Sequence, residues 1–228
     1  MNGKHLRVTE ERIPIGASPE PIWATLARPE GSIGIVIFAH GSGSSRFSPR
    51  NRFVADYLMR AGYTTVLADL LTESEEAIDA VTSAYRFDIA LLAGRLTVVT
   101  RHVKALFDGI GEPIGYFGAS TGAAAALISA ADSSSAVCAV VSRGGRPDLA
   151  VEALAAVSAP TLLIVGGNDR PVIELNRQAR AALQAPSELV IVPGAGHLFE
   201  EPGVLETVAD LSVDWFGRHF RRAARRSA

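Results

Sequence analysis

A serine lies between two glycines in the stretch GASTG, residues 118–122. The apolar run PIGYFG before it is typical of a strand, and the alanine-rich run after it is typical of a buried helix. Ser120 is therefore expected on a sharp strand-to-helix turn, where glycines two places away avoid a clash and the hydroxyl is exposed. Such a hydroxyl becomes a nucleophile when a base takes its proton. Tight packing of a helix on a strand would favour the same small residues.

A base and an acid follow Ser120 in the chain. Among five histidines, His197 lies in VPGAGHLFEE, directly after the last strand-like run. Asp169, in VGGNDRPV, lies at the end of the preceding strand-like run. Asp148, in SRGGRPDLA, is the alternative acid, but its place at an apparent helix start also fits an ordinary capping role. We favour Asp169, which gives the order serine, aspartate, histidine.

Apolar runs alternate with helical patterns along the chain. Strands are predicted over residues 33–39, 64–69, 113–118, 136–142, 160–167 and 188–194, and helices over 49–62, 86–109, the alanine-rich run after Gly122, 174–184 and 201–220. Runs that are apolar throughout suit a parallel sheet covered on both faces. The first thirty residues predict an antiparallel hairpin at one sheet edge. We therefore expect one α/β domain over residues 1–228, a three-layer sandwich around a mostly parallel sheet of about eight strands.

The loops after the strands carry the reactive residues. In a parallel sheet, ligands bind beyond the carboxyl ends of the strands, so these loops are expected to share one rim. The link over residues 144–159 has only 16 residues, too few for a helical lid domain. We expect an open site for small substrates.

Four motifs at these loops, HGSGSS, GASTG, GGNDRPV and GAGHLF, resemble those of the α/β-hydrolase superfamily, and more narrowly of its dienelactone-hydrolase-like branch. The resemblance runs from about Leu6 to Phe220. It implies Ser120 as nucleophile, His197 as general base and then acid, and Asp169 as the orienting carboxylate. Enzymes that act on dienelactone typically carry cysteine at the nucleophile position. Serine here favours a serine hydrolase of small esters, lactones or thioesters, working through an acyl-enzyme.

Two backbone amides are expected to hold the oxyanion of that reaction. One is the amide of Thr121, which follows the nucleophile. The other is expected from HGSGSS, where we favour Ser42 over Gly43. The loop lacks the phosphate-binding glycine patterns, and the chain lacks HExxH or paired-cysteine spacing, so neither a cofactor nor a metal is predicted.

Arginines are expected at the same rim. Arg46 follows the glycine-rich loop, and Arg143 and Arg146 follow a predicted strand. We predict that Gly43, Arg46 and Arg143 contact the substrate, with the arginines gripping a carboxylate. Solvated loop arginines, or salt bridges to acids such as Asp148, are the alternative.

The composition limits which classes of protein and of binding partner are expected. A net charge of −2 argues against nucleic acid as a partner. No apolar run reaches the 18 or so residues needed to cross a bilayer. A single cysteine, Cys138, and an N-terminus without an apolar core predict a cytoplasmic protein, monomeric or homodimeric. The alternative to an enzyme is a catalytically inert α/β-hydrolase-fold protein that binds a ligand or acts as a scaffold.

Overall fold

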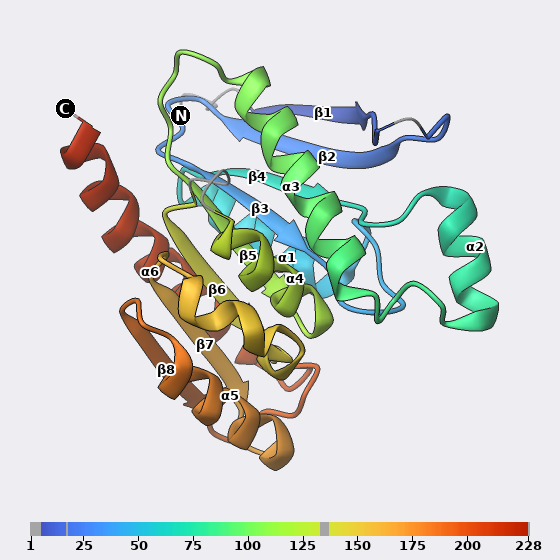
Figure 1. Ribbon diagram of the computed structural model, residues 1–228. Coiled ribbons are helices and arrows are strands. Elements are labelled where there is room, and N and C mark those ends of the chain that lie inside the picture. The colour runs from blue at the N-terminus through green and yellow to red at the C-terminus, as the bar shows by residue number, and fades with distance from the viewer. Residues whose placement is uncertain (1–5, 17, 133–136, 228) are drawn as a thin grey trace.

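The computed structural model describes residues 6–16, 18–132 and 137–227 (Figure 1). Its strands are β1 (Leu6–Ile13), β2 (Ile22–Pro29), β3 (Ile35–Ala39), β4 (Thr64–Ala68), β5 (Ile114–Ala119), β6 (Ala139–Arg143), β7 (Thr161–Gly166) and β8 (Ser187–Val192). Its helices are α1 (Pro49–Arg60), α2 (Glu73–Thr82), α3 (Ile89–Leu106), α4 (Thr121–Ala131), the 3₁₀ helix η2 (Pro147–Ala156), α5 (Arg170–Ala182) and α6 (Val204–Ser227).

The eight strands form one sheet in the order β1-β2-β4-β3-β5-β6-β7-β8. β1 pairs with β2, and β2 with β4, in antiparallel fashion, whereas the remaining pairs are parallel. The predicted edge hairpin and mostly parallel sheet are therefore confirmed. Each predicted inner strand is present, with ends shifted by a few residues; Ala136, the first residue of one prediction, lies outside the described residues.

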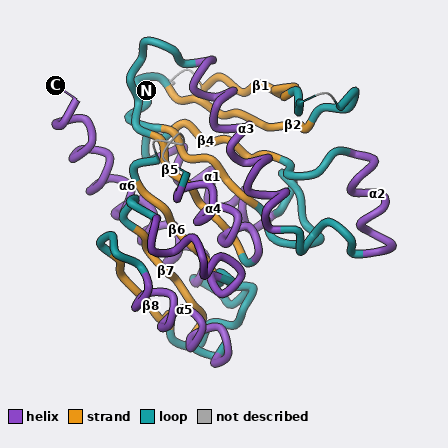
Figure 2. Tube along the Cα trace, viewed as in Figure 1, coloured by secondary structure: helices purple, strands orange, loops and turns teal. Residues whose placement is uncertain are grey.

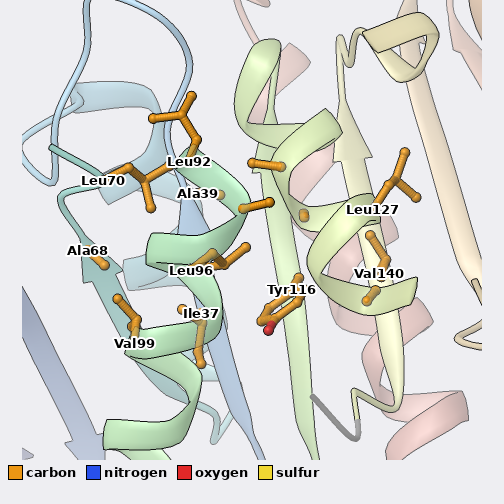
Figure 3. Packing of buried hydrophobic residues seen from close by; sticks show 14 of the residues in the cluster. Ile37, Ala39, Ala68, Leu70, Leu92, Leu96, Val99, Tyr116, Leu127 and Val140 are labelled. Carbon is orange, nitrogen blue, oxygen red and sulfur yellow. The ribbon is translucent and has the colours of Figure 1, made fainter. Parts of the chain in front are cut away.

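Two separate cores cover the two faces of the sheet. Every residue of β3, β5 and β7 is buried, because their side chains alternate between the two faces; Val165 of β7 packs in a third, smaller cluster with Val172 and Ile173 of α5. On one face, Ile37 and Tyr116 pack beneath α3 and α4 (Figure 3). On the other, Phe38 and Phe117 pack with α1 and α6, their ring centroids 4.8 Å apart. The result is the three-layer sandwich that the sequence predicts.

Helix α2 is absent from the helices that the sequence analysis predicts, as is the short 3₁₀ helix η2. Helix α2 extends away from the sheet at the side of β4 (Figures 1 and 2). Thr72 and Glu75 form a capping box at its start, a sequence signal that could have found it. Between β6 and β7 the chain forms only η2, so no lid domain is inserted there, as expected. In the part of the chain that the structure describes, no helix combines the length and apolar character of a membrane span.

Candidate active site

Ser120 forms the sharp turn between β5 and α4. Its φ of 51° and ψ of −120° lie in a region that costs a residue other than glycine about 1–3 kcal/mol. Neighbouring backbone holds this conformation: the Ser120 amide donates to the Arg143 carbonyl at 3.2 Å, and the Arg146 amide donates to the Ser120 carbonyl at 3.1 Å. Strain held in this way at an exposed hydroxyl fits the strand-turn-helix geometry that the sequence predicts.

Glycine is required beside Ser120 for close packing. A Cβ at Gly122 would lie 2.3 Å from the carbonyl oxygens of both Ala39 and His40. A Cβ at Gly41 would lie 3.1 Å from the Cβ of Ser120. The glycines therefore let α4 and the loop after β3 pack closely around Ser120. The same small residues leave the serine hydroxyl exposed.

His197 lies between Ser120 and Asp169. Its Nε2 atom is 3.4 Å from Oγ of Ser120, and its Nδ1 atom is 2.6 Å from Oδ2 of Asp169. The first distance is at the long end of a hydrogen bond, as is common before substrate binds. The second orients the ring, and a neutral ring that donates from Nδ1 to Asp169 turns an unprotonated Nε2 toward the serine hydroxyl.

Two loops hold this pair in place. Asp169 occupies the N-cap position of α5, yet its side chain makes no capping bond because it points to His197. On the other loop, Glu201 accepts a hydrogen bond from the Gly196 amide at 2.8 Å. Phe199, with a φ of 56° and 1% of its surface exposed, anchors the loop in the core.

Asp148, the alternative acid, has a different partner. Both of its carboxylate oxygens accept hydrogen bonds from Arg146 at 2.8 Å. That bidentate bond raises the pKa of Arg146. The structure therefore brings Asp169, and not Asp148, to His197, and it places Arg146 in a local salt bridge.

A pocket of about 240 Å³ lies over Ser120. It is lined by Gly41, Ser42, Ser44, Ser48, Arg50, Asn51, Ala119, Ser120, Arg143, His197 and Leu198. Ser42 belongs to this pocket, whereas Gly43 lines a neighbouring one. Thr121 is the first residue of α4, where a backbone amide has no acceptor within its helix. Of the two favoured oxyanion donors, Thr121 therefore follows Ser120 directly in the chain, and Ser42 lines the same pocket as Ser120.

His40 supports the loop that carries Ser42. Its Nδ1 atom lies 2.9 Å from the carbonyl oxygen of Gly41, and its Nε2 atom accepts from the Leu70 amide at 3.2 Å. Burial lowers the pKa of His40, which favours the neutral ring that these two bonds require. His40 therefore shapes the backbone of this loop through both ring nitrogens.

Arg46 lies outside the pocket that Ser120 lines. Its backbone amide and its guanidinium both bond to the carboxylate of Asp69, and Glu10 lies 3.4 Å from its Nε atom. This pairing argues against the predicted contact of Arg46 with the substrate, since Asp69 after β4 and Glu10 in β1 already neutralise its charge. Gly43 has a φ of 66° and shapes the loop after β3.

Several pocket residues were missed by sequence reasoning. Arg50 and Asn51 reach the pocket from the start of α1. No motif marks them, because only the packing of α1 against β4 and α6 brings its first turn to the pocket of Ser120. Arg143, by contrast, was predicted and does line the pocket.

Residues 22–213 match the model of the dienelactone hydrolase family. A dienelactone hydrolase from Anabaena variabilis is 52% identical, covers 93% of this chain and 99% of its own, and superposes with a TM-score of 0.88. This chain belongs to the dienelactone hydrolase family.

More distant structures share the fold of this family member. An α/β serine hydrolase homologue from Coxiella burnetii is 21% identical, with a TM-score of 0.71 over 93% of this chain and 96% of that one. Est1E from Butyrivibrio proteoclasticus is 15% identical, with a TM-score of 0.75 over 92% and 98%. At these identities the likeness speaks for the α/β-hydrolase fold alone.

Two Mycobacterium tuberculosis proteins are also similar, at 55% identity over 92% of this chain. They are provisionally named as phosphoribosyl transferases. The match covers 46% of their length, so this chain spans about half of each. More than half of each named protein therefore lies outside the region that resembles this family member.

Proposed function

We propose that this protein is a serine hydrolase that cleaves small carboxylic esters, lactones or thioesters through an acyl-enzyme on Ser120. The observation that carries this proposal is the chain of contacts from Ser120 through His197 to Asp169. A strained serine, a facing imidazole and a carboxylate behind it are the three groups that acyl transfer requires. Membership of a hydrolase family supports the same reaction class.

In the first half-reaction, Oγ of Ser120 attacks the substrate carbonyl carbon while its proton passes to Nε2 of His197. The negative charge that develops on the carbonyl oxygen is held by the amides of Thr121 and Ser42. The tetrahedral intermediate then loses its alkoxide or thiolate, which leaves with the proton from His197. The acyl group remains on Ser120 as an ester.

In the second half-reaction, a water attacks the acyl carbon and gives its proton to His197. The bond to Oγ then breaks, and the proton returns to Ser120, so the enzyme is regenerated and a carboxylic acid is released. Asp169 stays ionised throughout, because its role is to orient the ring and stabilise the imidazolium. The small pocket favours short acyl groups over long chains.

Covalent labelling tests the proposal. A fluorophosphonate probe should modify the wild-type protein at Ser120, located by peptide mapping. The Ser120→Ala variant should lose both labelling and hydrolysis of an activated acetate ester, by several orders of magnitude in turnover. Folded wild-type protein that neither takes the probe nor cleaves the ester would instead support the inert ligand-binding alternative.

A further inference from the structure

The short loop over residues 144–146, called the β6 loop below, holds the backbone of Ser120. It follows β6 directly and ends where η2 begins. The Arg146 amide donates to the Ser120 carbonyl at 3.1 Å, and the Ser120 amide donates to the carbonyl of Arg143, the last residue of β6, at 3.2 Å. Both backbone polar groups of Ser120 are therefore bonded to this loop or to the residue before it.

The β6 loop also packs against His197. Gly144 has a φ of 52°, a left-handed conformation that glycine adopts at little cost. A Cβ at Gly144 would lie 3.2 Å from the carbonyl oxygen of His197 and 3.7 Å from Cε1 of its ring. One loop thus contacts both Ser120 and His197, so a shift of this loop would change how the hydroxyl meets the imidazole.

The middle carbonyl of the β6 loop is held by a buried amide on α5. Nδ2 of Asn176 donates to the Gly145 carbonyl at 3.0 Å and to the Val172 carbonyl, one turn earlier in α5, at 2.8 Å. Asn176 is fully buried, on the same inward face of α5 as the apolar residues Val172 and Ala179. Asn176 is therefore a polar residue in an otherwise apolar stripe.

An amide at such a position is unfavourable for stability alone. Taking it out of water costs free energy that only hydrogen bonds offset, and Oδ1 of Asn176 has no partner among the described residues. The bond to Gly145 joins residues that are 31 positions apart in the chain. Because α5 begins directly after Asp169, which bonds to His197, Asn176 connects the helix behind the acid to the loop that holds Ser120.

We infer that Asn176 is a positioning residue, whose bond to Gly145 fixes the β6 loop and thereby keeps Oγ of Ser120 within reach of Nε2 of His197. Asn176 itself lines no part of the pocket over Ser120. A displacement of about 1 Å at a reacting group can lower a rate by about 100-fold, so one bond behind the site can matter for turnover. The effect on turnover rests on the proposed function; the effect on the loop does not.

Amide hydrogen exchange tests the loop without chemistry. Asn176→Leu fills the position but removes both bonds, so the amides of Arg146 and Ser120 should exchange about tenfold faster or more, relative to amides of β3. Leu183→Ala is the matched control, because Leu183 is buried at the end of α5, about two turns beyond Asn176. Unchanged exchange at Arg146 and Ser120, or an equal rise in Leu183→Ala, would overturn the positioning role.

Fluorophosphonate labelling gives the catalytic readout, because it separates the number of competent sites from the speed of each. Asn176→Leu should label to the same final stoichiometry as the wild type, with a second-order rate constant about 10- to 100-fold lower. Leu183→Ala should label at the wild-type rate. Reduced stoichiometry with an unchanged rate would mean that Asn176→Leu is partly unfolded and would contradict the inference.

Asn176→Ser separates the two bonds of Asn176. A serine hydroxyl in a helix can donate to the carbonyl four residues earlier, here that of Val172, but its side chain is too short to reach Gly145. Asn176→Ser should therefore label as slowly as Asn176→Leu, and wild-type rates in either variant would overturn the inference. A wild-type protein that takes no probe would refute the proposed function instead, and hydrogen exchange would still decide whether Asn176 holds the loop.

Discussion

The Nδ1 atom of His197 and the Oδ2 atom of Asp169 lie 2.6 Å apart, although the two residues come from loops after different strands. Only 14% of the Asp169 side chain is exposed, against 39% for His197. The carboxylate is thus shielded behind the ring that it orients, while the ring itself faces the pocket.

Asp169→Asn should therefore lower turnover of an activated ester by about 10³- to 10⁴-fold, because the amide favours the wrong tautomer of His197. The fold should be unchanged, as judged by circular dichroism. Asp148→Asn is the matched control, and it should retain turnover because Asp148 bonds to Arg146. The reverse result, with Asp148→Asn inactive, would assign the acid to the other loop.

Gly122 and Gly94 should respond in opposite ways to alanine. At Gly122 the added Cβ meets two carbonyl oxygens at 2.3 Å, so Gly122→Ala should destabilise the protein by about 2 kcal/mol or more. At Gly94, within α3, nothing lies within 4 Å of the added Cβ. Gly94→Ala should stabilise by about 0.5–1 kcal/mol through helix propensity. Urea unfolding of both variants measures the difference, and similar stabilities for the two would contradict the close packing of α4.

His40 should make stability depend on pH. Because burial lowers its folded-state pKa, the unfolded chain binds this proton first as the pH falls below about 6.5. Stability should therefore be lost on acidification between that value and the folded-state pKa. His40→Gln keeps an acceptor for the Leu70 amide without a titrating group.

The measurement compares urea midpoints at pH 7.5 and pH 5.5 for wild type and His40→Gln. Wild type should lose more stability between the two pH values. The pKa of His219 is also lowered, chiefly by burial, but His219 is present in both proteins and cancels in the comparison. Equal losses would mean that His40 does not carry the acid sensitivity.

Arg46 should support catalysis without distinguishing an anionic substrate from a neutral one. Its bonds to Asp69 hold the loop of Ser42, so Arg46→Gln should lower kcat for anionic and neutral esters by similar factors. Steady-state kinetics on an activated monoester of succinic acid and on its methyl-capped, neutral counterpart checks this. A decrease in kcat confined to the anionic ester would instead support the substrate contact that the sequence analysis predicts for Arg46.

Much of the fold was predictable because its signals are local. β3, β5 and β7 are apolar runs flanked by turn residues, and a run buried on both faces must belong to the interior of a parallel sheet. Since the carboxyl ends of such strands share one edge, the loops of Ser120, Asp169 and His197 could be placed together from their positions in the chain.

Only the tertiary structure decided which charged side chains have a partner of opposite charge. In the sequence, Arg46 and Arg143 both lie in or next to loops after predicted strands, and nothing in their local pattern separates them. Arg46 bonds to Asp69, which is 23 residues away, whereas Arg143 donates to the side-chain oxygen of Asn51, which is 92 residues away, and lies near the Phe199 ring. Electrostatic roles depend on partners and on burial, and long-range packing supplies both. The sequence by itself therefore indicated which loops form the candidate site, and the three-dimensional contacts decided which of the charged side chains there already have partners.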